Sequence, residues 1–291
     1  MPLTMENMIE PMTPNELQQL IKLVESVCAI QLDTSKQYLL ETRLLKILIE
    51  YKCKSYSDFL ELMKSSAKTK IEPVLIDAMT TKETLWFRDV HPFEVIKTHI
   101  LSELIQHNPS GQIKLWSAAC STGQEPYSLA MLVHEYAEAH PNLKLLEQNQ
   151  VHIVGTDIAN SAILLSKMGR YDILAMGRGL SLERKHKFFE SQGRVHVIKD
   201  HVKALCEFKQ ANLQDDLTNI VGRNFDVICL RNVAIYFSPD FKEALFNRLA
   251  KLLKPNGYLI LGATESMTGL QTPFTPQLID KTTVFRLRHS H

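Results

Sequence analysis

The sequence of 291 residues is poor in cysteine and glycine, and both shortages exclude classes of protein. The five cysteines are odd in number and scattered, with no C-x-x-C pair: Cys28, Cys53, Cys120, Cys206 and Cys229. This spacing excludes a disulfide framework or a cysteine zinc site and predicts reduced thiols. The eleven glycines form neither the G-x-G-x-x-G dinucleotide motif nor a G-x-x-x-x-G-K-[ST] phosphate loop.

Excess charge and long apolar runs are also lacking. Lys and Arg number 33 against 32 Asp and Glu, a net charge of +1, which argues against a nucleic-acid partner held by a broad basic surface. No apolar run reaches the roughly 18–20 residues that span a bilayer, so no membrane insertion is expected. The first 16 residues are polar and acidic and do not resemble an export signal, which favours a cytoplasmic location.

The first part of the chain has a helical pattern only. Thr13 and Glu16 form a capping box around Pro14, and apolar residues then recur at helical spacing. Further helices are expected over 38–51 and from residue 55. We therefore predict an all-α N-terminal domain over 1–78, with a linker at about 70–90.

From residue 111 the pattern becomes α/β. Short apolar strands alternate with helices, which indicates a mostly parallel sheet buried on both faces in a second domain over 79–291. The strands are expected at 113–119, 151–156, 225–230 and 258–263, with helices at 125–138, 159–168 and 240–253 and a closing strand at 283–287. Residues 193–209 contain two polar, alternating strand candidates with no helix between them, and predict a small antiparallel insertion at about 190–210.

Ligands of such sheets bind beyond the carboxyl ends of the strands. After the first strand, small residues over 117–123 permit close approach of the backbone to a ligand, and Glu125 follows. Asp157 ends the second strand, where a carboxylate can accept both hydroxyls of a ribose. The alternative is that Asp157 only caps a tight turn.

Two further segments carry polar residues, one directly after a strand and one between the two domains. Residues 231–237 place Arg231, Asn232 and Tyr236 directly after a strand, where they either form a site or tie down the loop. Residues 80–89 join the two domains. One interpretation is an amphipathic linker with Trp86 and Phe87 in the interface between the domains. This interpretation explains Arg88 and the threonines of the segment less well.

Together these segments resemble the CheR family of chemotaxis receptor methyltransferases, which use S-adenosylmethionine (SAM). The matching pieces are TTKETLWFRD, LWSAACSTGQEPYSLAM, VGTDI, the Asn212–Leu213 pair and LRNVAIYF. The resemblance spans nearly the whole chain. It implies a Rossmann-like class I methyltransferase domain with a mostly parallel seven-stranded sheet and a small antiparallel β insertion.

The resemblance also implies roles for individual residues. Asp157 would hold the ribose of the cofactor, and Asn212 and Leu213 would border the adenine. Around the amino-acid end it places Glu125, Thr84 and Arg88, and Ala119 of the 117–123 loop would also bind the cofactor. Arg231, Asn232 and Tyr236 would face the sulfonium and the substrate. Lys82 stands where the family usually has asparagine, and a lysine there can meet the methionine carboxylate.

The implied reaction is methylation of glutamate side chains of chemoreceptors, with Arg88 and Tyr236 as the catalytic residues. A glutamate with a pKa near ~4.3 is already ionised at neutral pH, so no general base and no metal is expected. Alternatives are a methyltransferase of the same scaffold with another protein or small-molecule substrate, and a non-catalytic SAM-binding regulator.

The expected partner is the helical cytoplasmic bundle of a chemoreceptor, met at arrays on the inner membrane face. The segment from Lys36 to Lys70 contains eight basic and four acidic residues. This excess of positive charge either steers an acidic helix of the substrate toward the domain or is simply a solvated helix face. Some relatives dock a receptor tether on the β insertion, but the short connection over 188–194 with one glycine favours an enzyme that does not. A monomer is expected, and the N-terminal domain offers a surface for regulatory partners.

Overall fold

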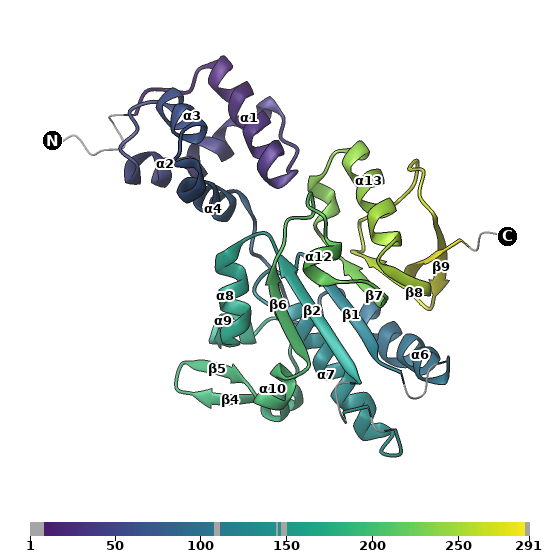
Figure 1. Ribbon diagram of the computed structural model, residues 1–291. Helices are drawn as coiled ribbons and strands as arrows, with labels where there is room; N and C mark the ends of the chain where they lie inside the picture. Colours follow the sequence, from purple (N-terminus) through teal and green to yellow (C-terminus); the bar gives the residue numbers. More distant parts are fainter. Residues whose placement is uncertain (1–8, 108–110, 144, 147–149, 289–291) are drawn as a thin grey trace. The chain divides into compact units, whose positions relative to one another are not determined.

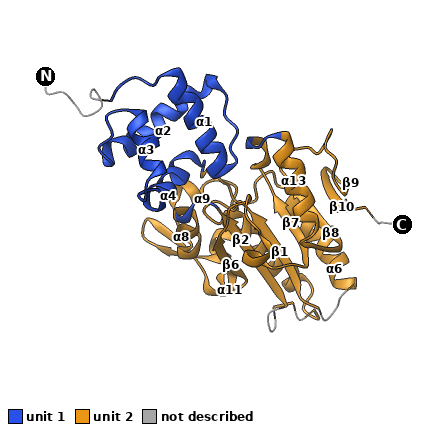
Figure 2. Cartoon of the chain, turned by 45° about the horizontal axis from the view of Figure 1, so that its top comes forward, with its two compact units in different colours: residues 1–81, 158–160, 236–238 blue, residues 82–157, 161–235, 239–291 orange. Residues whose placement is uncertain are grey.

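The computed structural model describes residues 9–107, 111–143, 145–146 and 150–288 (Figure 1). Contacts divide the chain into two compact units (Figure 2). Unit 1 holds the residues up to Thr81 together with 158–160 and 236–238, and unit 2 holds 82–157, 161–235 and 239–291.

Unit 1 is built from helices, as the sequence predicts. They are α1 (Pro14–Cys28), the 3₁₀ turn η2 (Thr34–Lys36), α2 (Gln37–Glu50), α3 (Tyr56–Lys64) and α4 (Lys68–Met79). The predicted capping box is confirmed: the Thr13 hydroxyl accepts from the Glu16 N–H, and the Glu16 carboxylate accepts from the Thr13 N–H at 2.8 Å. The core of the unit consists of fully buried aliphatic side chains such as Leu20, Leu40 and Leu44.

A buried carboxylate links two of these helices. Glu16 is 6% exposed, and its Oε1 accepts from both the N–H and the hydroxyl of Ser57 in α3, at 2.8 and 2.7 Å. One side chain therefore caps α1 and anchors the first turn of α3.

Unit 2 contains a seven-stranded sheet with the order β6-β2-β1-β7-β8-β10-β9. Its strands are β1 (Ile113–Ala118), β2 (Val151–Asp157), β6 (Cys206–Gln210), β7 (Phe225–Leu230), β8 (Leu253–Leu261), β9 (Phe274–Ile279) and β10 (Thr282–Leu287). The first five strands in that order are parallel, and β10 runs antiparallel to β8 and β9. All six residues of β7 are buried, as expected of a strand covered on both faces. The predicted mostly parallel sheet is confirmed.

Helices surround this sheet. They are α5 (His91–Val95), the π-helical turn η3 (Ile96–Ile100), α6 (Leu101–His107), α7 (Gln124–Ala139), α8 (Asn160–Met168), α9 (Ile173–Met176), α10 (Leu182–Phe188), α11 (Asp200–Lys203), α12 (Thr218–Val221), the 3₁₀ turn η4 (Ala234–Tyr236) and α13 (Pro239–Ala250). Helix α7 packs on β1, β2 and β6, and α5 packs on β10. No helix in the described parts of the chain is long and apolar enough to cross a membrane.

A second, three-stranded antiparallel sheet has the order β3-β5-β4, with β3 at Arg170–Asp172, β4 at Phe189–Gln192 and β5 at Val195–Ile198. The expectation that both strand candidates of 193–209 belong to this insertion is wrong. β5 does, but β6 pairs in parallel with β2 at the edge of the large sheet. The short helix α11 redirects the chain between them, and β6 looks polar because an edge strand is covered less than a central one.

Elements that the sequence did not predict include strand β9 and the helical run over 91–107. Strand β9 contains Pro276, which is tolerated because β9 is the outer edge of the sheet. The run of α5, η3 and α6 over 91–107 is also helical, and its π turn interrupts the regular helical spacing of its apolar residues.

Candidate active site

The loop between β1 and α7 has an unusual backbone. Ala119, Ser121 and Gly123 all have positive φ, at 63°, 50° and 93°. Left-handed conformations cost non-glycine residues about 1–2 kcal/mol each, so the surroundings must hold this loop in place. They do: the Cys120 N–H donates to the Thr156 carbonyl at 2.8 Å, and the Ser166 hydroxyl donates to the Ser121 carbonyl at 3.0 Å.

Ser121 brings two of the predicted site residues together. Its N–H donates to Oδ2 of Asp157 at 2.8 Å, and its hydroxyl donates to the carbonyl of Lys82 at 2.9 Å. The Lys82 ammonium in turn donates to the Ser161 hydroxyl at 2.6 Å. The 80–89 segment, the β1 loop and the end of β2 therefore meet at one place.

Arg231 joins a second group. Its Nη1 donates to Glu125 at 2.7 Å, and its Nη2 donates to Oδ2 of Asp89 at 2.8 Å and to the carbonyl of Arg88. The other Glu125 oxygen accepts from the Ser117 hydroxyl at 2.7 Å. The end of β7 is thus tied to the start of α7 and to the 80–89 segment.

The Arg231 side chain is only 2% exposed. Burial alone would lower the pKa of its guanidinium, but the carboxylates of Glu125 and Asp89, together with the neighbouring Cys229, hold that pKa above its ordinary value. Its Nε is buried without a partner among the described residues. The geometry makes Arg231 a positioning residue for Glu125, and its predicted contact with the cofactor stays a prediction.

Arg88 and Thr84 are half-buried on the same segment. The Arg88 carbonyl is bonded to Arg231, but its guanidinium makes no hydrogen bond or ion pair with any residue that the structure describes. A cation in this state suits the carboxylate of a ligand.

Asn212 and Leu213 form a turn after β6. The Asn212 side-chain oxygen accepts from the Gln214 N–H at 3.0 Å, and Leu213 is 8% exposed. Arg248 of α13 donates to the carbonyls of Leu213, Gln214 and Asp215, at 2.6, 3.0 and 3.0 Å. Arg248 therefore fixes the turn that is expected to border the adenine.

Glu265 fixes the loop after β7. Its carboxylate accepts from the N–H groups of Asn232, Val233, Ile235 and Gly262 at 2.7, 3.0, 3.3 and 2.7 Å. Asn232 has a φ of 59° and lies against Gly262 so closely that a Cβ there would come within 2.7 Å of the Asn232 Nδ2.

Tyr236 ends the η4 turn and belongs to unit 1. Its side chain is 38% exposed, and its carbonyl accepts from the Gln31 N–H at 2.8 Å. Its role stays a prediction.

Reasoning from sequence missed Asp89, Arg248 and Glu265, which act through other residues. Asp89 was visible as the last residue of TTKETLWFRD, and Glu265 as an acidic residue just beyond β8. No group of three His, Cys, Asp or Glu that could hold a metal ion exists in the described ranges.

The donor set fits S-adenosylmethionine. Asp157 offers a carboxylate to ribose hydroxyls, Glu125 a carboxylate to an ammonium group, and Arg88 a guanidinium to a carboxylate. The residues of the 117–123 loop around Ala119 are small, so its backbone carries no bulky side chains.

Comparisons with known proteins agree with this geometry. Residues 82–283 match the model of the CheR methyltransferase SAM-binding domain, and residues 15–80 match that of the CheR methyltransferase all-alpha domain. A chemotaxis protein methyltransferase of Vibrio anguillarum is 42% identical over 274 residues, 94% of this chain and 97% of that protein. Chemotaxis protein methyltransferase 1 of Pseudomonas aeruginosa is 42% identical over 248 residues, 85% and 88% of the two chains.

Among solved structures, a magnesium protoporphyrin IX methyltransferase of Synechocystis with bound SAM is 12% identical and has a TM-score of 0.34. That match covers 79% of this chain and 93% of the other. The two family models together account for most of the chain, and the sequence resemblance is confirmed. The chain belongs to the CheR family of S-adenosylmethionine-dependent chemotaxis methyltransferases.

Proposed function

We propose that this enzyme methylates glutamate side chains in the helical cytoplasmic bundle of chemoreceptors, forming glutamyl methyl esters. The observation that carries the proposal is the donor set of Asp157 at the end of β2, Glu125 at the start of α7 and Arg88 in the 80–89 segment. These side chains complement the ribose, ammonium and carboxylate of the methyl donor. When bound, S-adenosylmethionine supplies an electrophilic methyl group on a sulfonium.

In this proposal, the residues of the chain bind the cofactor and orient it toward the acceptor glutamate. Asp157 holds the ribose, and Glu125, kept in place by Ser117 and Arg231, holds the amino group. Arg88 pairs with the carboxylate, and Asn212 and Leu213 line the adenine. Because a glutamate is ionised at neutral pH, the enzyme needs to align it and exclude water rather than remove a proton.

Tyr236 is proposed to align the acceptor carboxylate through its hydroxyl. Tyr236→Phe should then lower kcat about tenfold or more while the Kd for S-adenosylhomocysteine, measured by calorimetry, changes less than twofold. An equal loss in both quantities would make Tyr236 a cofactor-binding residue instead.

The helical unit is proposed to steer the receptor. Of the eight basic residues between Lys36 and Lys70, Arg43 is bonded to the Met79 carbonyl, and Lys64 and Lys68 pair with Glu61 and Glu72. The remaining basic side chains would attract an acidic helix electrostatically. We further propose that the enzyme is a cytoplasmic monomer that works at receptor arrays without a tether, and that its helical unit is open to regulatory partners.

The direct test is transfer of a labelled methyl group from S-adenosylmethionine to receptor cytoplasmic fragments. The control fragment carries glutamine at the candidate glutamates, and ester formation is checked by release of the label in mild base. Base-labile label that vanishes in the control is the expected result. Tight binding of S-adenosylhomocysteine without any transfer would instead indicate another substrate or a non-catalytic SAM-binding regulator.

A further inference from the structure

Tyr171, in β3 of the three-stranded sheet, is buried between two segments of the candidate site. Its hydroxyl donates to the Thr122 carbonyl in the 117–123 loop, at 2.8 Å. Its ring packs edge-on against the ring of Trp86 in the 80–89 segment, with the two centroids 4.7 Å apart. Both contacts lie within unit 2. One side chain of the small sheet therefore joins two segments that are distant in the chain.

The hydroxyl of Tyr171 is a fixed donor. The residue is 5% exposed, and burial raises the pKa of the hydroxyl well above its ordinary value, so the proton stays on the oxygen. The loop that receives this bond contains Ala119 and Ser121 in left-handed conformations, which persist only where the surroundings hold them. The bond to the Thr122 carbonyl holds the loop directly before the first turn of α7, where Glu125 lies.

Trp86 is anchored by the small sheet and by α9 with the turn after it. Its ring meets Phe189 of β4 at a centroid distance of 5.2 Å, and its Nε1 donates to the Ala175 carbonyl at 3.1 Å. Its backbone N–H donates to the Arg178 carbonyl at 3.2 Å. Gly179 follows with a φ of 93°, and a Cβ on it would come within 2.0 Å of the Trp86 carbonyl. Backbone lies against backbone here, so Trp86 has little room to move.

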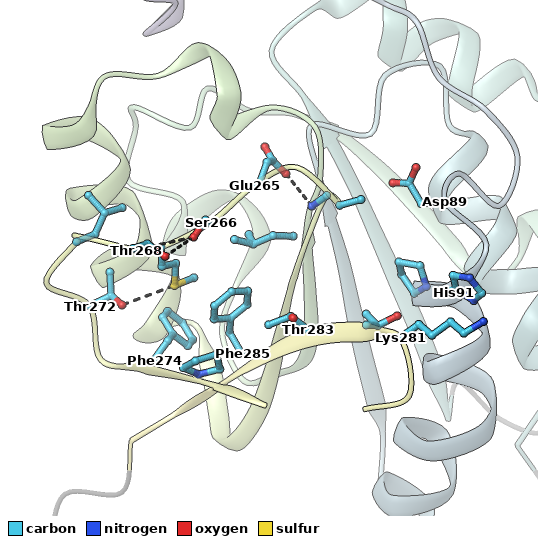
Figure 3. Close-up of a pocket in the computed structure, with 18 of the residues that line it drawn as sticks. Asp89, His91, Glu265, Ser266, Thr268, Thr272, Phe274, Lys281, Thr283 and Phe285 are labelled. Atoms are coloured by element: carbon cyan, nitrogen blue, oxygen red, sulfur yellow. Dashed lines mark hydrogen bonds between the residues drawn. The ribbon is translucent and has the colours of Figure 1, made fainter. Parts of the chain in front are cut away.

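Arg88 lies between two anchors of its segment. One is Trp86, and the other is Arg231, which donates to the Arg88 carbonyl and to the Asp89 carboxylate. Packing does not hold the segment on its Asp89 side, because Asp89 and His91 are exposed and line a pocket of about 540 Å³ (Figure 3). The direction of the Arg88 side chain therefore depends on Trp86 and Arg231 together.

We propose that Tyr171 is a positioning residue for binding of the cofactor. Its hydroxyl fixes the 117–123 loop, and its ring, through Trp86, fixes the segment that carries Arg88. The three-stranded sheet thereby sets the spacing between Arg88 and Glu125, which are assigned to the carboxylate and the ammonium of the cofactor's amino-acid end. This inference rests on the proposed function, because it deepens the assignment of those two groups.

The test measures by calorimetry how the whole chain binds two ligands. One is S-adenosylhomocysteine, and the other is methylthioadenosine, which keeps the adenosine and the sulfur but lacks the amino-acid end. Tyr171→Phe keeps the ring and removes the hydrogen bond, so the Kd for S-adenosylhomocysteine should rise about fivefold, as the loss of one hydrogen bond implies. The Kd for methylthioadenosine should change less than twofold. Tyr171→Leu also removes the ring contact with Trp86 and should raise the Kd for S-adenosylhomocysteine further.

Tyr258→Phe is the matched control. Tyr258 of β8 is 1% exposed, and its hydroxyl donates to Glu103 of α6 at 2.5 Å rather than to a segment of the candidate site. This variant also loses a buried hydroxyl bond, but it should change neither Kd. A purely structural role of Tyr171 would lower the melting temperature or the number of binding sites and leave the ratio of the two Kd values as in the wild type.

The inference is overturned if Tyr171→Phe binds S-adenosylhomocysteine as Tyr258→Phe does, or if it loses affinity for both ligands by the same factor. Neither readout involves a receptor, so a lack of methyl transfer to receptor fragments would refute the proposed substrate without altering this result. A wild-type enzyme that binds the two ligands equally well would refute the placement of Arg88 and Glu125, and the inference with it.

Discussion

Arg231 is almost fully buried, and its charge is balanced by carboxylates from two different segments, Glu125 and Asp89. Removing one member of such a group leaves a buried charge without a partner, which commonly costs about 3–5 kcal/mol. The arrangement therefore fixes Glu125 in one orientation. At the scale of single residues, the site depends on side chains that never need to touch the cofactor.

Asp157 offers a direct test at this scale. Its carboxylate already accepts from the Ser121 N–H and is predicted to accept from ribose hydroxyls too. Asp157→Asn removes the charge, so the Kd for S-adenosylhomocysteine should rise about 10- to 100-fold by calorimetry. Asp240→Asn, an exposed change in the first turn of α13, is the control. An unchanged affinity for Asp157→Asn would show that the ribose lies elsewhere.

At the scale of elements, the ends of neighbouring strands are packed together too closely for any added atom. A Cβ on Gly262 would lie 2.7 Å from the Asn232 side chain and 2.9 Å from its backbone nitrogen. Since the Asn232 loop is held by Glu265 at the same point, neither side can yield easily. Strain at the end of β8 is thus transmitted to the end of β7.

Gly262→Ala should therefore lower kcat for methyl transfer about tenfold or more and destabilise the fold by about 1–3 kcal/mol. Gly177→Ala is a matched control, because its added Cβ would meet only ordinary contacts at 3.4 and 3.5 Å. Kinetics and denaturant unfolding of both variants are the measurements. If Gly262→Ala retains wild-type activity and stability, the loop is softer than this packing implies.

The link between α1 and α3 predicts a pH effect. Burial acts to raise the pKa of Glu16, but hydrogen bonds from Thr13 and Ser57 outweigh it and leave that pKa below its usual 4.5. The ionised form is therefore bound more tightly in the folded unit. Its contribution to stability is complete above about pH 4.5 and is lost as the pH falls through the lowered pKa.

Glu16→Gln should cost about 1–2 kcal/mol at pH 7 and flatten the loss of stability below pH 4.5. Denaturant unfolding followed by far-ultraviolet circular dichroism between pH 3 and 7 measures both effects. Glu50→Gln, at the exposed end of α2, should keep the wild-type profile. A Glu16→Gln profile parallel to the wild type would contradict the role given to this carboxylate.

At the scale of the whole molecule, the cysteine thiols are largely shielded from solvent. All five cysteines are free thiols; four are buried and Cys206 is partly buried. Burial, with the charge of Glu72, raises the pKa of Cys28 to about 12, and burial also raises the pKa values of Cys120 and Cys229.

A disulfide reagent such as dithionitrobenzoate should therefore modify the native enzyme slowly at pH 8, with fewer than one thiol reacting in minutes. All five should react at once in guanidinium. Absorbance of the released thionitrobenzoate gives both counts. Rapid reaction of a thiol in the folded protein would show that one of the two units opens readily.

Sequence patterns were sufficient where the signal is local. The burial of every residue in β7, the capping box at Thr13 and the helix α7 all follow from neighbouring residues in the chain. Sequence patterns failed to predict an element where its place in the fold depends on partners distant in the chain. β6 looks like part of a polar insertion until its pairing with β2 is known, and β9 is hidden by Pro276.

The same division holds for the site. Its family was readable from the sequence alone, because the segments that carry the resemblance are short runs of neighbouring residues. Only the tertiary structure revealed Asp89, Arg248 and Glu265 as the residues that hold those segments, since each reaches its partners across more than thirty positions of the chain or from another element.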